Sequence, residues 1–269
     1  MADTVAIARE LMGLLGSGRQ IQPFSARDPA FDLAQAYEVS ADILAMRIAR
    51  GEIPVGRKIG FTNTGIWQLY GVSGPMWSHV FDTTLHDLAA IGEGFALAGL
   101  AEPRIEPEIV LHLARAPRAG MDEDELLHCV DWVAHGFEIV HSCFPGWRFA
   151  IADTAAAYGL HGALLLGPRH AIAQDRAAWH AALRTFTLAL YRDGRPVAEG
   201  HARNVLGGPL SALRFLVAEI ARTRPGDALR AGEIVTTGTL TDAQPIGPGE
   251  TWSTTLSGID IGGLHIRLA

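Results

Sequence analysis

A ten-residue stretch with strict two-residue alternation occupies residues 104–113: Arg-Ile-Glu-Pro-Glu-Ile-Val-Leu-His-Leu. Successive side chains of a β-strand point to opposite faces of a sheet, so this alternation predicts a strand with one buried face. One face would carry Ile105, Pro107, Ile109, Leu111 and Leu113, and the other Glu106, Glu108, Val110 and His112. Because Pro107 cannot donate a ladder hydrogen bond, it indicates a sheet edge or a strand end, where a cavity is expected.

A third glutamate lies inside a later apolar run, Phe137-Glu138-Ile139-Val140. If Glu106, Glu108 and Glu138 came together without a cation, they would repel one another and be driven toward protonation. Mg²⁺ and Mn²⁺ prefer oxygen ligands and leave positions open for water or substrate, so the three acids are candidate metal ligands. The spacing alone leaves a second interpretation open. Glu106 and Glu108 would then be the solvated face of an amphipathic strand, and Glu138 would be paired elsewhere.

Further short β-like runs recur from about residue 80 to the end of the chain, with a hairpin signal, Asp-Gly, at residues 193–194. The other expected strands span residues 96–100, 137–140, 163–166, 185–191, 234–237, 251–256 and 264–268, and the expected helices span 6–15, 33–48, 122–134 and 210–221. This order predicts an α+β fold rather than alternating βα units. We expect a helical N-terminal region at residues 1–75 and a mixed, β-rich catalytic domain at 76–269.

The composition excludes several classes of protein. The 269 residues are 48% hydrophobic and 19% charged, which is typical of a globular chain, and the net charge of −7 disfavours binding to nucleic acid or to an anionic membrane. The two cysteines, Cys129 and Cys143, are too few for a disulfide framework and are expected to be free thiols. No signal peptide or uninterrupted apolar run long enough for a membrane span is evident, so we expect a cytoplasmic protein.

Four segments together resemble the fumarylacetoacetate hydrolase superfamily, specifically its branch of 2-keto-4-pentenoate hydratases and 4-oxalocrotonate decarboxylases. They are RKIGFTN from residue 57, RIEPEIVLHL from 104, FEIV from 137, and GEIVTTGTLT with PIGPGE toward the C-terminus. The resemblance covers roughly residues 55–255. It implies a mixed, rolled β-sheet, bound Mg²⁺ or Mn²⁺, homo-oligomers and a role in aromatic catabolism. It also implies that Glu106, Glu108 and Glu138 are the metal ligands and that Lys58 is the site lysine.

The remaining candidate residues come from loops and strand ends. Lys58 lies between Gly56 and Gly60, which would allow close approach of a ligand, so it could bind a substrate carboxylate or stabilise an enolate. Gly238 and Thr239, at the end of an expected strand, could hold carboxylate oxygens or simply form a tight turn. Two weaker candidates for substrate binding are Asp82 and Asn204, the latter just before a glycine-led helix.

The chain departs from the hydratase branch downstream of the third acid. That branch carries Asp-Thr-Val-Ala-Asp-Asn-Ala-Ser, whereas residues 153–160 here are Asp-Thr-Ala-Ala-Ala-Tyr-Gly-Leu, followed by His161. The branch's Asp-Ser-Arg likewise becomes His-Ser-Cys at residues 141–143. His161 could supply the missing function as a general acid or base, because histidine titrates near the working pH, and it could equally be structural. The same two interpretations apply to His141.

The leading functional hypothesis is a metal-dependent hydratase that adds water to a 2-hydroxy-2,4-dienoate or 2-oxo-4-enoate, a small 2-oxo acid. Two other reactions can use the same enolate chemistry, namely decarboxylation of a vinylogous 2-oxo diacid and hydrolytic C–C cleavage of an acylpyruvate-like compound. A hypothesis of another class is a catalytically silent relative that binds a 2-oxo acid or a partner subunit, suggested by the loss of Asp-Asn-Ala-Ser.

Overall fold

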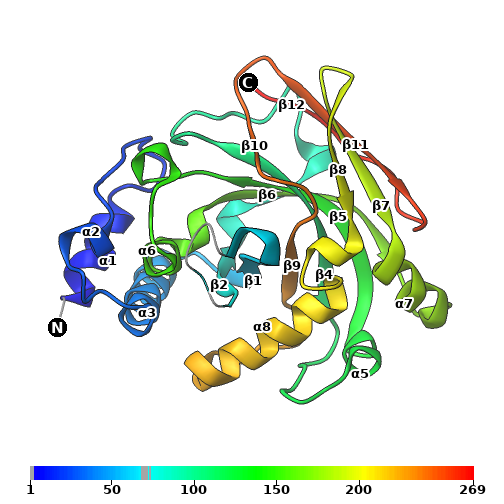
Figure 1. Cartoon of the computed structure of the whole chain (residues 1–269), viewed down its shortest axis with the longest axis horizontal. Helices are drawn as coiled ribbons and strands as arrows, with labels where there is room; N and C mark the ends of the chain where they lie inside the picture. The colour runs from blue at the N-terminus through cyan, green and yellow to red at the C-terminus, as the bar shows by residue number, and fades with distance from the viewer. Residues whose placement is uncertain (1–2, 68–71, 73) are drawn as a thin grey trace.

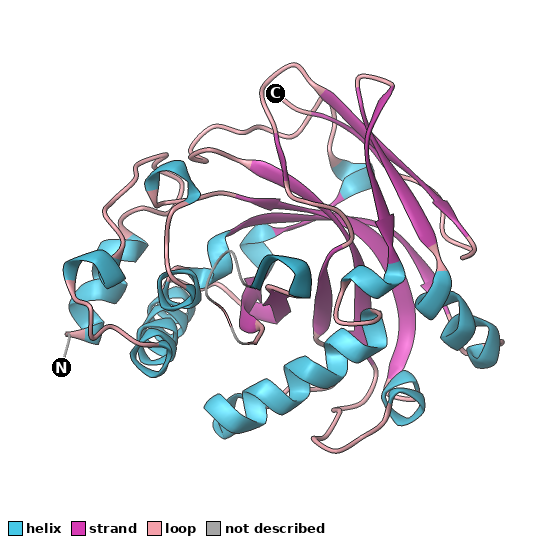
Figure 2. Ribbon diagram, in the orientation of Figure 1, coloured by secondary structure: helices cyan, strands magenta, loops and turns pink. Residues whose placement is uncertain are grey.

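The computed structural model describes residues 3–67, 72 and 74–269, and its centre is a large curled sheet (Figures 1 and 2). The strand order in this eight-stranded sheet is β2-β1-β9-β4-β5-β6-β3, with β10 pairing against β4. The pairs β1–β9 and β3–β6 are parallel and the other pairs are antiparallel. The strands are β1 (Pro54–Gly60), β2 (Met76–Phe81), β3 (Leu85–Asp87), β4 (Arg104–Leu113), β5 (Val130–Val140), β6 (His161–Ala171), β9 (Ile234–Thr239) and β10 (Gln244–Pro245). The predicted mixed, rolled sheet is confirmed.

A second sheet of four strands has the order β12-β11-β7-β8. Its strands are β7 (Thr187–Arg192), β8 (Arg195–His201), β11 (Thr251–Ser257) and β12 (His265–Arg267). Asp193 and Gly194 join β7 to β8 with φ angles of 51° and 74°. Two successive positive φ angles are what a two-residue hairpin turn of the primed type requires, and Asp-Gly adopts them readily. The predicted hairpin is therefore confirmed.

Four helices lie together at one side of the large sheet, the side where the N-terminus also lies (Figure 1). They are α1 (Thr4–Met12), α2 (Phe24–Arg27), α3 (Leu33–Ala49) and α6 (Ile151–Ala156), and α3 packs against both α1 and α6. Asp32 caps α3 by accepting from the backbone N–H of Gln35, whose side chain accepts in return from the backbone of Asp32. The helices predicted at 6–15 and 33–48 are confirmed within a few residues at their ends.

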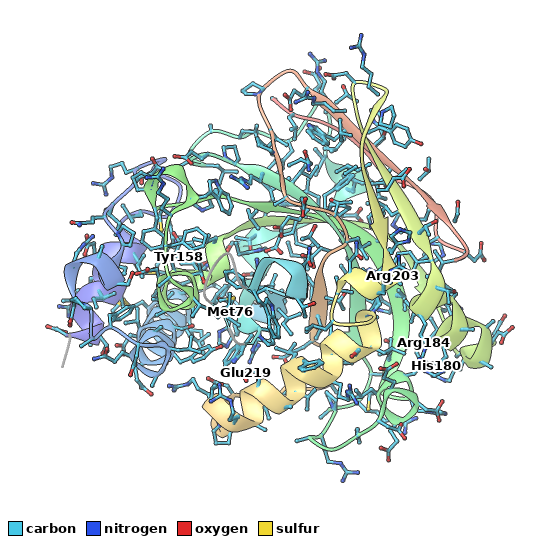
Figure 3. All side chains as sticks on the ribbon, viewed as in Figure 1. Met76, Tyr158, His180, Arg184, Arg203 and Glu219 are labelled. Atoms are coloured by element: carbon cyan, nitrogen blue, oxygen red, sulfur yellow. The ribbon has the colours of Figure 1, made fainter. Side chains whose placement is uncertain are left out.

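Three helices lie on the other side of the molecule: α5 (Glu123–Leu127), α7 (Arg176–Thr185) and α8 (Pro209–Thr223). Arg184 of α7 approaches Glu123 of α5 at 3.5 Å and ties these two helices together (Figure 3). The stretch Ala202–Thr223 is long and apolar enough to cross a membrane by length and composition alone. However, 56% of its most apolar window is buried, and α8 packs against β9, α5 and α7, so it serves as a core helix of this fold.

Two predictions of secondary structure are wrong, and one helix was not predicted. The helix expected at 122–134 ends at Leu127, because β5 begins at Val130 and pairs with both β4 and β6. The start of that helix is correct, since Asp122 caps α5 in a capping box with Glu125. The strand expected at 96–100 is a loop. The helix α7, Arg176–Thr185, was not predicted, although Trp179 and Leu183 are spaced four residues apart, as on one face of a helix.

Pro107 does not lie at an edge of the sheet, because β4 pairs with β5 on one side and β9 on the other. Its carbonyl accepts from the backbone N–H of Leu240 at 2.9 Å, so its nitrogen also faces β9. The β4–β9 register shifts between Glu108 and Val110 on that same side. Pro107 has no N–H group to donate, and its nitrogen lies where the ladder of hydrogen bonds to β9 is interrupted, beside a cavity.

Candidate metal centre and its cavity

Strand pairing brings the three glutamates together. Glu106 of β4 lies directly opposite Glu138 of β5 in the antiparallel register, and Glu108 lies two residues further along β4. One carboxylate oxygen from each residue lies within 4.8 Å of the others. Glu108 and Glu138 are 1% and 0% exposed, so they are not part of a solvated strand face.

Two nitrogen donors hold one oxygen of Glu138. Lys58 Nζ and His161 Nδ1 each lie 2.7 Å from Glu138 Oε1. Burial opposes the charged form of every group here, but Lys58 and His161 together lower the pKa of Glu138 to about 2. Burial would lower the pKa of Lys58 as well, yet Glu138, Glu106 and Glu108 outweigh it and raise that pKa above the ordinary value. Lys58 is therefore an ammonium group and Glu138 a carboxylate.

The other two acids are not neutralised in the same way. Burial raises the pKa of Glu106 to about 7, with Lys58 opposing and Glu138 adding to the rise. Burial, Glu138 and Glu106 raise the pKa of Glu108 well above its ordinary value. Among the described residues, Glu138 Oε2 is buried without a hydrogen-bond partner. Three converging carboxylates, one orphaned oxygen and a deficit of positive charge fit a hard divalent cation.

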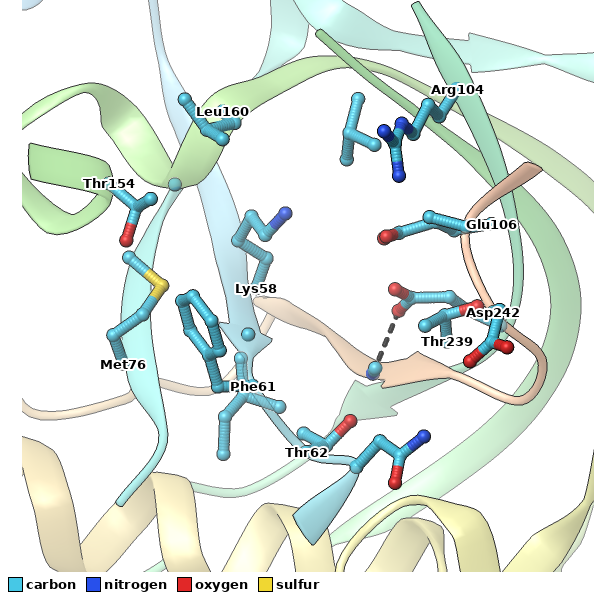
Figure 4. Close-up of a pocket in the computed structure, with 18 of the residues that line it drawn as sticks. Lys58, Phe61, Thr62, Met76, Arg104, Glu106, Thr154, Leu160, Thr239 and Asp242 are labelled. Atoms are coloured by element: carbon cyan, nitrogen blue, oxygen red, sulfur yellow. Dashed lines mark hydrogen bonds between the residues drawn. The ribbon is translucent and has the colours of Figure 1, made fainter. Parts of the chain in front are cut away.

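Glu106 and Glu108 line a cavity of about 390 Å³, into which Lys58, Arg104 and Glu106 point (Figure 4). Strands β1, β4 and β9 supply its polar side. The segment around η5 (Tyr158–Leu160), with Met76 of β2, supplies its apolar side. A cavity of this size suits a small organic acid.

Lys58 owes its position to the glycines that surround it. A Cβ on Gly56 would lie 2.1 Å from the carbonyl oxygen of Ile234, so this glycine permits the close parallel pairing of β1 with β9. Gly159 lies against the aliphatic stem of Lys58, where an added Cβ would be 3.0 Å from Lys58 Cδ. Gly56 therefore permits a close approach of β9 that positions Lys58, whereas Gly60 lines the cavity, where close approach of a ligand stays a prediction.

Gly238 is a structural requirement of the acid cluster. Its backbone N–H donates to Glu108 Oε2 at 2.9 Å, and its φ is 94°. An added Cβ would lie 1.9 Å from Thr62 Oγ1. We expect Gly238→Ala to lower the free energy of unfolding by about 3 kcal/mol or more, through the clash and the left-handed backbone together.

The matched control for this variant is Gly249→Ala. Gly249 has a similar φ of 86°, with nothing within 4 Å of an added Cβ. It should cost only about 1 to 2 kcal/mol, the backbone part of the penalty. Denaturant unfolding of the two variants measures the difference, and equal losses would show that the contact with Thr62 is unimportant.

The structure places the other predicted residues differently. Thr239 lines the cavity, although its hydroxyl donates to the carbonyl of Thr241 at 2.8 Å. Asp82 and Asn204 do not line it. The carboxylate of Asp82 accepts from the backbone N–H groups of Ile53 and Thr83, and Asn204 donates to the carbonyl of Leu240. Their predicted role in substrate binding is not retained, because these side chains stabilise loops.

Neither histidine faces the cavity. His161 lies behind Glu138, and its Nε2 is 2.9 Å from Thr84 Oγ1. Burial lowers the pKa of His161, with Glu138 opposing, so the ring orients the carboxylate as a largely neutral group. His141 is buried near Tyr158, with ring centroids 6.3 Å apart, and burial lowers its pKa to about 4. The positions of both histidines fit structural roles.

Several residues that line the cavity were not predicted from the sequence, notably Arg104, Met76 and Leu160. Arg104 could have been found, since period two places it on the face of β4 that carries Glu106. It stacks over Trp147, 4.2 Å from the ring centroid, and has no ion-pair partner in the described part of the chain. No local pattern marks Met76 or Leu160, because their role depends on which segments the fold brings opposite the acids.

The chain is similar in sequence to a known family and to two named hydratases. Residues 86–268 match the family described as fumarylacetoacetate (FAA) hydrolase, C-terminal. The chain is 30% identical over 253 residues to a 2-keto-4-pentenoate hydratase of Paraburkholderia xenovorans, covering 94% of this chain and 90% of that protein. It is 28% identical over 253 residues to a 2-hydroxyhexa-2,4-dienoate hydratase of Comamonas testosteroni, covering 93% and 92%.

The fold is also that of a solved relative. The 4-oxalocrotonate decarboxylase of Pseudomonas putida G7, complexed with magnesium and adipate, superposes with a TM-score of 0.89 over 99% of this chain and 97% of that one, at 24% identity. The family match spans more than half of the chain, and the hydratases match nearly its whole length. The predicted resemblance is confirmed, and the chain belongs to the fumarylacetoacetate hydrolase family.

Proposed function

We propose that the protein is a divalent-metal-dependent hydratase, a hydro-lyase of the 2-keto-4-pentenoate hydratase type. Its substrate would be a short 2-hydroxy-2,4-dienoate or its 2-oxo-4-enoate tautomer. The observation that carries this proposal is the cluster of Glu106, Glu108 and Glu138, with Lys58 beside it, at the end of a cavity of small-acid size. The relatives named as hydratases support it, since they match the chain from end to end.

Glu106, Glu108 and Glu138 would hold Mg²⁺ or Mn²⁺. When bound, such a cation supplies Lewis-acid stabilisation of negative charge on the 2-oxo oxygen of the substrate. The Lys58 ammonium adds a second, fixed positive charge at the same end of the cavity. His161 keeps Glu138 oriented through its Nδ1. The net reaction adds one proton and one hydroxyl group of water across a carbon–carbon double bond, giving a hydroxylated 2-oxo acid.

A substrate panel tests the proposal. The protein would be mixed with Mg²⁺ and, separately, with 2-hydroxydienoates and acylpyruvates, and the ultraviolet absorbance of each conjugated compound followed. We expect metal-dependent loss of dienoate absorbance, without release of carbon dioxide and with water incorporated in the product. Release of carbon dioxide from a diacid would instead identify a decarboxylase, and cleavage of acylpyruvates a C–C hydrolase. No change with any compound would indicate a binding protein.

The stabilisation that metal confers should depend on pH in a defined direction. Because the pKa of Glu106 is raised to about 7 and that of Glu108 is raised well above its ordinary value, protons compete with the cation below neutral pH. The rise in melting temperature caused by Mg²⁺, relative to protein in EDTA, should therefore grow as pH increases from about 5 to about 8. A metal-induced shift that is largest at pH 5 would contradict this assignment.

The proposal extends to the organisation of the protein. The helical N-terminal region, 1–75, and the β-rich catalytic domain, 76–269, would form one catalytic unit, since the first supplies Lys58 and the second the three acids. A cytoplasmic location fits the two buried, free cysteines, and a homo-oligomer is expected from the family. Light scattering coupled to gel filtration would measure the oligomeric state.

A further inference from the structure

The cavity has two chemically different sides (Figure 4). Arg104, Glu106 and Thr239 lie on one side, and Leu160, Met76 and Phe61 lie on the other, with Lys58 between them. Val140, Trp147 and Phe149 add further apolar surface, and the polar side chains of Thr62, Asn63, Thr241 and Asp242 also line the cavity. An acid that places its carboxylate and 2-oxo group near Lys58 and the glutamates would therefore direct its remaining carbons toward a hydrocarbon surface. We call Leu160, Met76 and Phe61 the apolar wall.

The backbone holds Leu160 in this wall. Its φ is 57°, in the left-handed region, and it follows Tyr158 and Gly159 at 43° and 65°. The N–H of Leu160 donates to the carbonyl of Ala157 at 2.8 Å, and its own carbonyl accepts from the N–H of His141 at 2.9 Å. A leucine pays a conformational cost in this region, and the hydrogen bonds on both sides keep it there. In the hydratase pattern the same position is a serine, so here a hydroxyl is exchanged for an isobutyl group.

Met76 is fixed in a comparable way. It is 1% exposed and pairs with Gly60 across β1 and β2. A Cβ on Gly60 would lie 3.0 Å from Met76 Sδ, so the glycine makes room for the thioether. Thr154, the polar neighbour on this side, donates its hydroxyl hydrogen to the carbonyl of Ile151 at 2.8 Å. The apolar wall therefore has a defined shape and offers no free hydroxyl donor from Thr154.

We propose that the apolar wall is a subsite for a hydrocarbon end. The enzyme would thus prefer short 2-oxo acids that end in an alkyl group over acids of the same length that end in a second carboxylate. This inference rests on the proposed function for the orientation of the substrate. A second carboxylate against Leu160 and Met76 would lose its hydration without gaining a donor, which disfavours binding, whereas each methylene removed from water there favours it.

Arg104 is the arginine of the lining, and its charge could oppose this preference. Its guanidinium is a potential partner for a second carboxylate. However, it lies on the acid side of the cavity, and Figure 4 shows it beside Glu106 and across from Met76. Its guanidinium therefore lies close to the carboxylates and away from the apolar wall (Figure 4). We therefore assign Arg104 to the charge balance of the acids.

Binding of two saturated acids tests the preference without requiring turnover. The acids 2-oxohexanoate and 2-oxohexanedioate each contain six carbons and differ only in a methyl or a carboxylate end. Calorimetry with the Mg²⁺-loaded protein should show that 2-oxohexanoate binds about tenfold more tightly or better. It should also bind about fourfold more tightly for each methylene by which it exceeds a shorter homologue, such as 2-oxobutanoate. Tighter binding of the diacid, lost in Arg104→Met, would overturn the proposal.

Two substitutions at Leu160 provide the matched comparison. Asparagine tolerates the left-handed backbone, so Leu160→Asn adds polarity without backbone strain, while Leu160→Met keeps the wall apolar. The asparagine variant should lose most of the preference for 2-oxohexanoate, and the methionine variant should keep it. Oxalate is too short to reach the wall, so its unchanged binding to both variants would show that the site is folded and loaded. Equal preferences in both variants would contradict the role of Leu160.

These measurements separate this inference from the proposed function. If none of the unsaturated acids is turned over, yet 2-oxohexanoate still binds more tightly than the diacid, the hydratase assignment fails and the apolar subsite stands. If dienoates are hydrated but methyl-ended and carboxylate-ended acids bind equally, the hydratase assignment stands and the apolar subsite fails.

Discussion

Replacing Glu108 by glutamine is expected to reduce metal-dependent turnover by roughly a thousandfold or more, because the variant loses one of three carboxylates that would hold the cation. Glu106→Gln should have a comparable effect. The same variants should not lose folding stability in EDTA. Glu108 is buried among like charges and its pKa is raised well above the ordinary value, so a neutral amide removes repulsion rather than a favourable interaction. These substitutions should therefore lower turnover without lowering the melting temperature in EDTA.

Calorimetry with Mg²⁺ or Mn²⁺ and thermal melts with and without EDTA would measure both quantities. Glu199→Gln is the matched control, since Glu199 is an exposed glutamate on β8 that does not line the cavity. It should leave turnover and the metal-induced rise in melting temperature unchanged. If Glu106→Gln and Glu108→Gln kept both turnover and metal binding, the assignment of these residues as ligands would be wrong.

The acid pair was predictable from sequence because its geometry is local. Alternation over residues 104–113 places Glu106 and Glu108 on one face of a strand, whatever the strand pairs with. Glu138 depends on something that no local pattern contains, the antiparallel register that sets it opposite Glu106. Its place in the cluster could therefore be expected only through resemblance to a family. The same holds for the sheet as a whole. The hairpin and the alternating runs are local patterns and were predictable from the sequence, whereas the order in which the strands pair was not.

The failures also have physical causes. The segment from Val130 to Ala134 continues a well-capped helix in sequence, but tertiary pairing with β4 and β6 makes it a strand. His161 was a candidate acid or base because histidine titrates near neutral pH. Its place behind Glu138 is set by the long-range β5–β6 pairing. From the sequence alone, leucine at residue 160 in place of the serine of the hydratase pattern indicated the loss of a polar catalytic function. Its position in the cavity instead points to a change in the surface that contacts the substrate.

Lys58 is distinguished by composition as well as by geometry. It is the only lysine in the chain, and all other basic side chains are arginine. The side chain of Lys58 lies in a space bounded by Gly159 and Ser78. An arginine would bring a larger, planar head group into this space, whereas lysine presents a compact charge to Glu138. The single lysine therefore lies where a small, fixed ammonium group is required.

Lys58→Met is expected to lower kcat by about a hundredfold to a thousandfold, the usual effect of removing one preorganised group that stabilises charge in the transition state. Methionine fills similar space without the charge. Metal affinity should be retained, because the carboxylates remain and Glu138 Oε1 keeps its contact with His161. The variant in EDTA should melt at a lower temperature than the parent, since Glu138 loses the ammonium group 2.7 Å from its Oε1, and added Mg²⁺ should restore most of the difference.

Arg57→Met is the informative control, because Arg57 neighbours Lys58 on β1 and points to the opposite face. Arg57 is buried and pairs with Glu233 at 3.1 Å, so its loss should cost about 3 kcal/mol of folding stability while leaving kcat of the folded enzyme unchanged. The two variants should thus show opposite patterns: lost catalysis with metal-restored stability for Lys58, and lost stability with intact catalysis for Arg57. If Lys58→Met kept its kcat, the lysine would serve only to balance the charge of Glu138, and stabilisation of the substrate's negative charge would rest on the metal centre alone.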